Sequence, residues 1–345
     1  MYREAVANIL KFREGDFLQI KDGAIFEVKG LLHPPKRVIA FIRYIPDPNG
    51  NRNLDGRTYK KVYSIEKRYE ILKKTYPHIL IYDDVFNEYL PEIQNSSIIH
   101  SFLPSRELSS LRKKARLDDI QKKALVCTKI LKREANMGWN DIGITGSICI
   151  GLYNYTSDID IIVYGRENCL RVYNVMQNLL KSKENISNYD IEGLKKLYQF
   201  RVKDTIMPFE DFVKHESRKN LQGMLDGKDV YVRCIKDWDE IGENYGEVIY
   251  EPQDYAKIRA KIIDDSESIF TPCTYKVNDV KIIEGNKVND LKEITSFRGR
   301  FCEQAKNGET VIAQGKIERV INIHEDHHRI LLGNKPTDFM IANIS

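Results

Sequence analysis

The sequence predicts an α+β protein with three successive domains, because of its length, its composition and the order of its strand and helix patterns. A chain of 345 residues is longer than one hydrophobic core usually serves. Its hydrophobic content of 42% supplies apolar material for several cores, and 30% charged residues is typical of a folded globular protein. The expected domains are residues 1–105, 106–245 and 246–345.

The first domain is predicted to mix strands with one helix. In DFLQIKDGAIFEVKGLL, Asp22 and Gly23 separate two alternating segments, which indicates a hairpin. RVIAFIRYI follows as a further strand. SIEKRYEILKKTY begins with a serine in the N-cap position and continues with apolar residues at helical spacing. Residues 1–105 are therefore expected to form a small α+β domain.

The middle domain is predicted to open with one long helix over residues 106–136. An apolar stripe at helical spacing supports it, made of Leu108, Leu111, Ala115, Ile120, Ala124, Cys127 and Leu131. The same segment carries a basic run of Arg112, Lys113, Lys114, Arg116, Lys122 and Lys123. This run could line the path of a polyanion, but a solvated helix face is the more common reason for such a pattern.

The rest of the middle domain alternates strands with helices. DIGITGS predicts a strand that ends in a turn, and SDIDIIVYG predicts a second strand, followed by a helix over residues 167–182. Further helices are expected up to about Leu225. KDVYVRCI, which follows the turn at Asp226 and Gly227, predicts a third strand.

The last domain is predicted to be mainly β. PQDYAKIRAKIID, residues 252–264, is expected to form a helix with Pro252 near its start. From residue 274 onward, short strand patterns alternate with Gly, Asn and Asp turns, which indicates a small barrel or sandwich. HEDHHR, residues 324–329, favours a surface turn over a metal site, because neighbouring His side chains on a strand diverge.

The net charge and its distribution along the chain bear on whether the protein binds a polyanion. The net charge of +4 is too small to indicate a nucleic-acid binder by itself. Residues 1–120 carry 21 Lys and Arg against 16 Asp and Glu, whereas residues 241–345 carry 14 against 17. A polyanionic partner is therefore expected to contact the first part of the chain.

The chain lacks the sequence signals of secretion and of membrane insertion. Its N-terminus is interrupted by charges, and no segment approaches the roughly 20 apolar residues that a membrane helix needs. None of the six cysteines forms a CxxC pair, so reduced thiols are expected. These features predict a soluble, cytoplasmic protein without a membrane partner.

The most informative stretch is GSICIGLYNYTSDID, residues 146–160. In a strand, Asp158 and Asp160 share a face, with Cα atoms about 6.6 Å apart. Two carboxylates this close repel each other unless a cation neutralises them, and oxygen ligands favour Mg²⁺. Gly146 permits a close backbone approach, and the hydroxyl of Ser147 can donate to a phosphate. One element is thus expected to hold phosphates and the next the metal.

This stretch resembles the signature of the DNA polymerase β-type nucleotidyltransferase superfamily, which includes CCA-adding enzymes. The pattern comprises Gly146, Ser147, Gly151, Ser157, Asp158 and Asp160. The resemblance covers about residues 120–240, and its spacing from Gly-Ser to the Asp pair matches the common form. The whole chain is also similar to an uncharacterised group of archaeal proteins described as predicted nucleotidyltransferases.

The resemblance implies a mixed sheet with helices and a site for a nucleoside triphosphate (NTP). Gly146 and Ser147, with Gly151 and Ser157, would bind the nucleotide, and the two aspartates would bind Mg²⁺ or Mn²⁺, two ions with nucleotide bound. A hydroxyl acceptor would receive the nucleoside monophosphate, and pyrophosphate would leave. The size of the flanking domains and the basic first half favour RNA or DNA as the acceptor.

Two positions depart from the superfamily pattern. Ile150 replaces an arginine that many members carry, and Tyr231 stands where a later strand usually supplies a third catalytic carboxylate. Asp229 lies two residues earlier on the same face and is the candidate substitute. Two alternatives to nucleic-acid nucleotidyl transfer therefore stay open: a degenerate member that only binds nucleotide or nucleic acid, and an enzyme that attaches AMP to a protein.

Two basic segments are weaker candidates for substrate contact. HPPKRVIAFIRY, together with nearby Tyr59, Lys60, Lys61 and Arg68, could form a nucleic-acid surface, although aromatic residues in strands more often belong to a core. Lys214, Arg218 and Lys219 precede the third strand and are candidates for phosphate contact.

Overall fold

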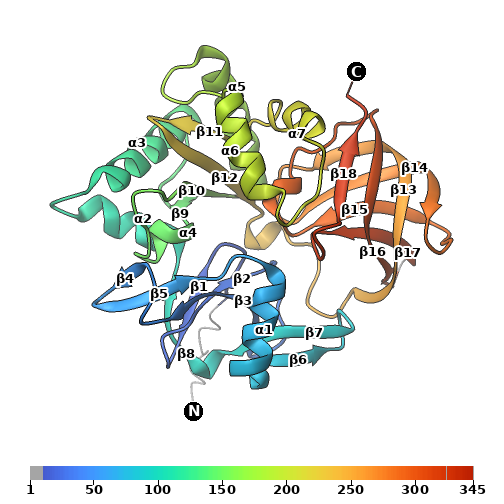
Figure 1. The fold of residues 1–345 in the computed structure, drawn as a ribbon, viewed down its shortest axis with the longest axis horizontal. Coiled ribbons are helices and arrows are strands. Elements are labelled where there is room, and N and C mark those ends of the chain that lie inside the picture. The colour runs from blue at the N-terminus through green and yellow to red at the C-terminus, as the bar shows by residue number, and fades with distance from the viewer. Residues whose placement is uncertain (1–10, 324, 345) are drawn as a thin grey trace, which may run out of the picture.

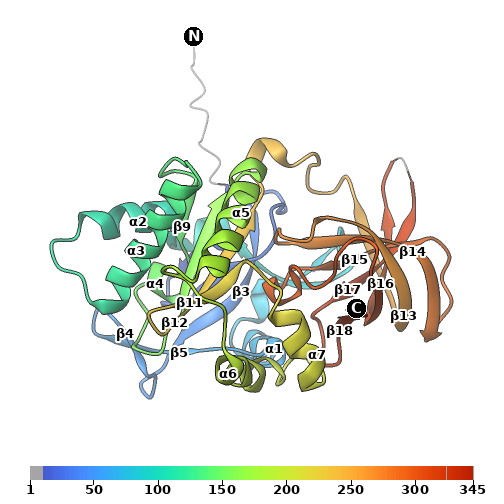
Figure 2. The same cartoon turned by 90° about the horizontal axis from the view of Figure 1, so that it is seen from above.

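The protein consists of three parts, an N-terminal, a middle and a C-terminal one (Figure 1). The computed structural model describes residues 11–323 and 325–344. Each part has its own cluster of buried apolar side chains, represented by Phe26 in the N-terminal domain, Ile161 in the middle domain and Ile294 in the C-terminal domain. Figure 2 shows the C-terminal strands at one end of the molecule and helices of the middle domain at the other.

The N-terminal domain is one sheet with a helix packed on it. The sheet has the order β4-β5-β3-β2-β1-β8, and β7 pairs with both β3 and β6. Its strands are β1 (Phe17–Ile20), β2 (Ile25–Val28), β3 (Arg37–Pro46), β4 (Arg52–Leu54), β5 (Arg57–Lys61), β6 (Leu80–Asp83), β7 (Glu88–Gln94) and β8 (Ile98–Phe102). The predicted hairpin joins β1 to β2, and Ser64 caps helix α1 (Ile65–Thr75) by accepting from the amide of Lys67 at 3.2 Å.

The middle domain is a four-stranded mixed sheet with helices around it, as predicted. Its strand order is β11-β12-β10-β9, and β10 runs parallel to β12. The strands are β9 (Ile142–Ile144), β10 (Ile159–Tyr164), β11 (Gln222–Leu225) and β12 (Lys228–Ile235). The helices are α2 (Pro104–Lys113), α3 (Asp119–Glu134), α4 (Gly146–Cys149), α5 (Arg166–Ser182), α6 (Ile191–Arg201) and α7 (Phe209–Glu216).

The single long helix predicted over residues 106–136 is wrong, because the chain forms α2 and α3 with a break between them. Asp118 starts the second helix: its carboxylate accepts from the amide of Gln121 at 2.9 Å, and the Gln121 side chain accepts from the amide of Asp118 in return. This capping box satisfies amides that a continuous helix would bond internally, so it favours a new helix start.

The C-terminal domain is a barrel. Strand pairing follows the order β13-β14-β15-β17-β16, and pairing of β13 with β16 closes the ring, while β18 adds to β16. The strands are β13 (Ile249–Glu267), β14 (Cys273–Glu284), β15 (Leu291–Ser296), β16 (Thr310–Ile321), β17 (His327–Leu332) and β18 (Phe339–Ala342). A closed ring leaves no open edge along the paired strands, which satisfies their backbone groups.

The helix predicted at residues 252–264 is wrong, because this segment lies within strand β13. Ala256, Ile258, Ala260 and Ile262 are all buried, and the charged residues between them face outward. This burial repeats every second residue, which is the period of a strand rather than of a helix. Alanine and charged residues, which are common in helices, concealed that period in the sequence.

The remaining structural expectations concern turns, cysteines and membrane segments. Of HEDHHR, where a turn was expected, Glu325 and Asp326 precede β17, His327 to Arg329 belong to that strand, and His324 lies outside the described residues. All six cysteines are described, buried and free. Within the described residues, no helix is long and apolar enough to cross a membrane. The cytoplasmic location stays a prediction.

Candidate active site

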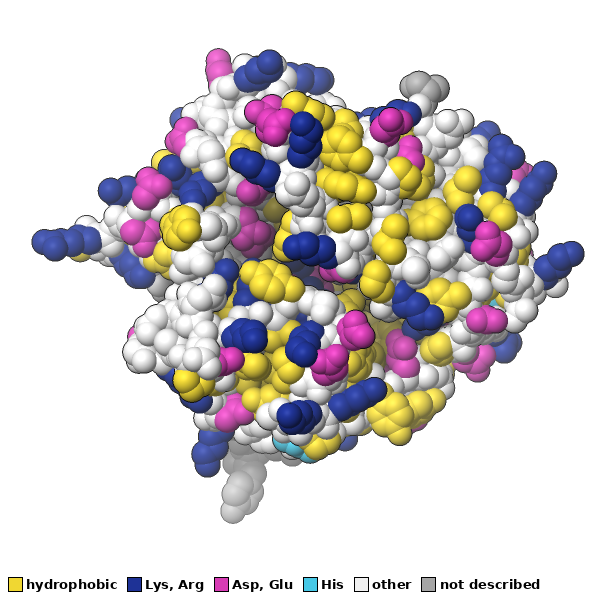
Figure 3. Space-filling model, viewed as in Figure 1, with side chains coloured by type: hydrophobic (Ala, Val, Ile, Leu, Met, Phe, Trp, Pro, Cys, Tyr) yellow, Lys and Arg dark blue, Asp and Glu magenta, His cyan; other side chains and the backbone are white. Residues whose placement is uncertain are grey.

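A cavity of about 1480 Å³ lies where the three domains meet. Figure 3 shows the same face hollowed at the centre, with acidic and basic side chains around the hollow. Lys61 and Arg68 line it from the N-terminal domain, Asp158 and Asp160 from the middle domain, and Arg298 from the barrel. Pockets for one small ligand usually measure about 300–1,000 Å³, so this cavity has room for two substrates.

The paired aspartates lie at the start of strand β10. Ile159 and Ile161 are fully buried in the core of the middle domain, so the alternating residues Asp158 and Asp160 face the other way and line the cavity. Asp158 is exposed and Asp160 is partly buried. The structure thus brings both predicted metal ligands to one cavity wall.

The carboxyl group of Asp160 is costly to ionise. Burial and the nearby Asp158 raise its pKa to about 7, although Arg233 and Lys61 act in the opposite direction. A pair of carboxylates that repel each other in a partly dry site favours a bound cation. The oxygen-only character of the pair suits Mg²⁺ or Mn²⁺.

Gly146 lies directly against this carboxylate. Its φ of +64° belongs to the left-handed region, and a β-carbon at this position would overlap the Oδ2 atom of Asp160. The turn before α4 and the carboxylate in β10 therefore fit together only with glycine at position 146.

We expect Gly146→Ala to displace Asp160 and to abolish metal-dependent nucleotide binding, in addition to the left-handed strain of about 1–2 kcal/mol. Calorimetric titration with ATP and Mg²⁺ measures the binding, and urea unfolding measures the strain. Gly56→Ala is the matched control, because Gly56 has a φ of +79° and no atom within 4 Å of a built β-carbon. Equal nucleotide binding by both variants would contradict the requirement for glycine beside the Asp160 carboxylate.

Ser147 and Gly151 belong to a segment that the N-terminal domain covers. Ile150 packs in an apolar cluster with Tyr44 and Phe17, which explains an apolar residue where the superfamily often has arginine. The hydroxyl oxygen of Ser147 is buried and has no hydrogen-bond partner among the described residues, so an acceptor or donor from a ligand would satisfy it. Gly151 has a φ of +72°. Neither Ser147 nor Gly151 lines the cavity.

Ser157 shapes the loop before the Asp pair. Its hydroxyl accepts from the amide of Asn154 at 3.0 Å and from Nη1 of Arg52 at 3.3 Å. Arg52 also donates to the carbonyl of Leu152, so one buried guanidinium of the N-terminal domain holds both ends of the loop. Sequence reasoning missed Arg52, because nothing local links it to a loop 100 residues later.

Tyr231 lies opposite Asp160 in the parallel pairing of β10 with β12. Its hydroxyl is buried without a hydrogen-bond partner among the described residues. Asp229 lines the same cavity and faces Tyr189, whose pKa is raised by burial and by this carboxylate. Within residues 11–323 and 325–344, no group of three or more His, Cys, Asp or Glu side chains is arranged to hold a metal ion. Asp229 as third carboxylate therefore stays a prediction.

Lys61 is a cation on the cavity wall that interacts electrostatically with both candidate metal ligands. Burial and Arg43 lower its pKa to about 8, while Asp158 and Asp160 raise it. Its ammonium lies 5.2 Å from the ring centre of Tyr63 and has no ion pair with a described residue. The sequence flagged Lys61 and Arg68 as a possible nucleic-acid surface, and the structure places both on the cavity wall.

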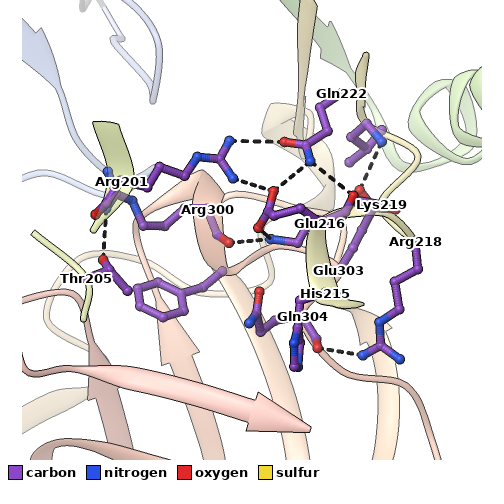
Figure 4. A network of polar contacts seen from close by, with 12 residues as sticks. Arg201, Thr205, His215, Glu216, Arg218, Lys219, Gln222, Arg300, Glu303 and Gln304 are labelled. Carbon is purple, nitrogen blue, oxygen red and sulfur yellow. Dashed lines mark hydrogen bonds and ion pairs between the residues drawn. The ribbon is translucent and has the colours of Figure 1, made fainter. Parts of the chain in front are cut away.

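A buried polar network joins the middle domain to the barrel (Figure 4). Arg201 of α6 donates to Glu216 of α7 and, at 3.0 Å, to Gln222 of β11. Lys219 donates to Glu216 at 2.8 Å and to the backbone carbonyl of Arg300 at 2.6 Å. The network fixes the barrel turn around η4 (Gly299–Phe301), which borders the cavity, against the middle domain.

The phosphate contacts predicted for Lys214, Arg218 and Lys219 are not supported by their positions. None of the three lines the cavity. Arg218 forms an ion pair with Glu309, and Lys219 belongs to the network described above. The charges of Arg218 and Lys219 serve contacts between domains.

Comparison with known proteins identifies the middle domain. The model of the nucleotidyltransferase domain family matches residues 127–224. An uncharacterised protein of Methanocaldococcus jannaschii is 28% identical over 333 residues, which cover 94% of this chain and 96% of that protein. No solved structure matches the chain. The matched residues, 127–224, include the Gly-Ser turn and both cavity-facing aspartates, so the family match falls on the part of the chain that carries the candidate site.

Proposed function

We propose that the protein transfers a nucleoside monophosphate from an NTP to a hydroxyl group of a nucleic-acid acceptor, RNA or DNA, and releases pyrophosphate. The observation that carries the proposal is the fit between Gly146 and Asp160 within a matched nucleotidyltransferase domain. The large cavity supports it, because transfer requires an NTP and an acceptor side by side.

The residues at the Asp pair fit a divalent cation. Asp158 and Asp160, which line the cavity, would hold Mg²⁺ or Mn²⁺, with two ions when nucleotide is present. A bound divalent cation supplies charge neutralisation for the phosphates and for the attacking oxygen. The raised pKa of Asp160 agrees with a site completed by a cation.

The remaining groups of the site would position the two substrates. The acceptor oxygen forms a bond to the α-phosphorus, the bond from that phosphorus to the bridging oxygen of pyrophosphate breaks, and the hydroxyl proton leaves to solvent. Lys61, which has no ion pair of its own, would bind the triphosphate in place of the arginine that Ile150 replaces. Gly146 would keep the Asp160 carboxylate in its place beside the bound triphosphate.

Lys61→Met is expected to weaken ATP binding roughly tenfold, the size of one charge-assisted hydrogen bond. The Lys61 pKa of about 8 gives the pH dependence: its ammonium is charged below that value, so wild-type affinity should fall as the pH rises through 8. The variant should lack this fall. Calorimetry across this pH range measures both, with exposed Lys60→Met as control. The same fall in Lys61→Met would refute the assignment.

The test of the proposed function is an acceptor screen. The protein is incubated with Mg²⁺, each labelled NTP, and RNA, DNA or protein acceptors, beside an Asp158→Ala/Asp160→Ala variant. Label on a nucleic-acid end that depends on both aspartates supports the proposal. Label on a protein side chain would instead indicate an AMP-attaching enzyme.

A degenerate, purely binding protein is the second candidate. The observation that favours it is Tyr231 opposite Asp160, at the place of the usual third carboxylate. Calorimetry separates the candidates: tight ATP binding together with no transfer to any acceptor would favour the binding protein.

A further inference from the structure

Three arginines from two domains line one side of the central cavity, and we call them the arginine wall. They are Arg43 of β3, Arg68 of α1 and Arg298, which directly precedes η4. They are close enough to repel each other, since burial first and then Arg43 and Arg298 lower the pKa of Arg68 to about 9. Like charges gathered around a cavity are costly unless an anion binds there.

Arg68 is the least compensated member of the wall. Its exposed fraction is 8%, and its buried Nε has no hydrogen-bond partner in the described part of the chain. No described carboxylate forms an ion pair with it, and Glu27 and Asp204, which favour its charge from farther away, do not outweigh burial and the two neighbouring arginines. Because α1 is capped by Ser64, the backbone that carries Arg68 is fixed.

The neighbouring carboxylates already serve other cations. Glu27 contacts Arg43 at 3.5 Å and Lys29 at 3.0 Å, and Asp204 accepts from Arg298 at 2.6 Å and also from Arg300. Around the wall, the cations are Lys29, Arg43, Arg68, Arg233, Arg298 and Arg300, and the carboxylates that interact with them are Glu14, Glu27, Asp160 and Asp204. The region therefore carries excess positive charge.

An aromatic pair lies beside the wall. Tyr63 and Phe200 are each about half exposed, line the cavity and meet edge to face with ring centres 6.1 Å apart. The guanidinium of Arg43 lies 5.9 Å from the ring centre of Tyr63. Cations that bind a backbone next to aromatic rings that stack bases are typical of sites for single-stranded nucleic acid.

We propose that Arg43, Arg68 and Arg298 form a second phosphate site, which holds a backbone phosphate of a single-stranded nucleic-acid acceptor. This inference rests on the proposed function, because the phosphates of the NTP are assigned there to the Asp pair and Lys61. The wall then serves the second substrate, whose end nucleotide stacks against Tyr63 and Phe200. The cavity volume permits both substrates at once.

The test measures binding without catalysis. A labelled single-stranded RNA of about ten nucleotides is titrated in the absence of NTP, and its affinity is followed against salt. Arg68→Met should weaken binding at least about tenfold and reduce the salt slope by roughly 0.7, the value of one lost phosphate contact. Arg68→Lys should recover part of the affinity. Lys67→Met, an exposed neighbour on α1, should change little.

Two comparisons keep this inference separate from its alternatives. Calorimetry with ATP should give the same affinity for Arg68→Met as for the wild type, and weaker ATP binding with unchanged RNA binding would assign the wall to the nucleotide. Unchanged binding of both ligands would overturn the phosphate site. RNA binding through Arg68 without any nucleotidyl transfer would contradict the proposed function and leave the site intact.

Discussion

Asp160→Asn is expected to lose nucleotidyl transfer by roughly 10³-fold or more, and at the same time to make the metal-free protein more stable. The loss of activity follows from the proposed function, in which Asp160 is a charged metal ligand. The gain in stability follows from the pKa of Asp160, which burial and Asp158 raise to about 7. Asparagine keeps the size of the side chain and removes the charge that the site disfavours.

The pH dependence of this stability has a definite sign. Between the unfolded value of 3.8 and about 7, the folded protein binds the extra proton, so wild-type stability falls as the pH rises through this window. Asp160→Asn should lack the fall, so its advantage should be near zero at low pH and on the order of 1–3 kcal/mol above pH 7. Urea unfolding in chelator, at several pH values, measures it.

Asp55→Asn is the matched control for Asp160→Asn, because Asp55 is exposed in the hairpin turn between β4 and β5. Its φ of +50° suits asparagine equally well. This control should change neither transfer nor the pH profile. If Asp160→Asn unfolds at a lower urea concentration than the wild type at pH 8, the charge of Asp160 does not destabilise the metal-free fold, and the prediction is wrong.

Glu216→Gln is expected to lower the free energy of unfolding by about 3–5 kcal/mol, the range for breaking one partner out of a buried ion pair. Glu216 is 6% exposed and serves both Arg201 and Lys219, so glutamine would leave two buried cations without their carboxylate (Figure 4). Because glutamine has nearly the same shape, the loss reports charge rather than packing. Urea unfolding near neutral pH measures it.

Acid should reduce this difference. Burial alone would raise the pKa of Glu216, but Arg201 and Lys219 outweigh it and lower the pKa to about 2. The carboxylate therefore stabilises the fold above its unfolded pKa of about 4.3, and the contribution is lost as the pH falls from there through 2. The gap between wild type and variant should shrink between neutral pH and pH 3.

Glu192→Gln controls for the removal of a Glu in the same region. Glu192 is exposed and pairs with Lys195 at 2.7 Å on the surface of α6, where such pairs contribute about 0.5 kcal/mol or less. A similar loss of unfolding free energy in both variants would show that the buried ion pairs of Glu216 contribute no more than a surface pair.

The parts of the site that could be predicted from the sequence are local. Gly146 and Asp160 lie within one unit of strand β9, helix α4 and strand β10, so their spacing alone predicts that the Gly-Ser turn meets the aspartate pair. Tyr231 was predicted at the third carboxylate position from the pattern of its strand, and pairing of β10 with β12 places it opposite Asp160.

What the sequence did not predict depends on contacts between distant segments. Arg68 and Arg298 are far apart in the chain, and only the closed arrangement of three domains brings them to one wall. The strand β13 was mistaken for a helix, because alanines and charges suit both periods and only pairing with β14 and β16 decides between them. Long-range pairing leaves little trace in a single sequence.

The position of Tyr231 constrains the evolution of the barrel. A β-carbon at position 299 would overlap the Tyr231 hydroxyl, so tyrosine in β12 and glycine before Arg300 depend on each other. Homologous chains with aspartate at the position of Tyr231 are expected to be free to carry larger residues at the position of Gly299, whereas chains with tyrosine should keep glycine. The two positions should thus covary although separate domains contribute them. A chimera that receives a barrel with a larger residue at position 299 should place that side chain against the Tyr231 hydroxyl.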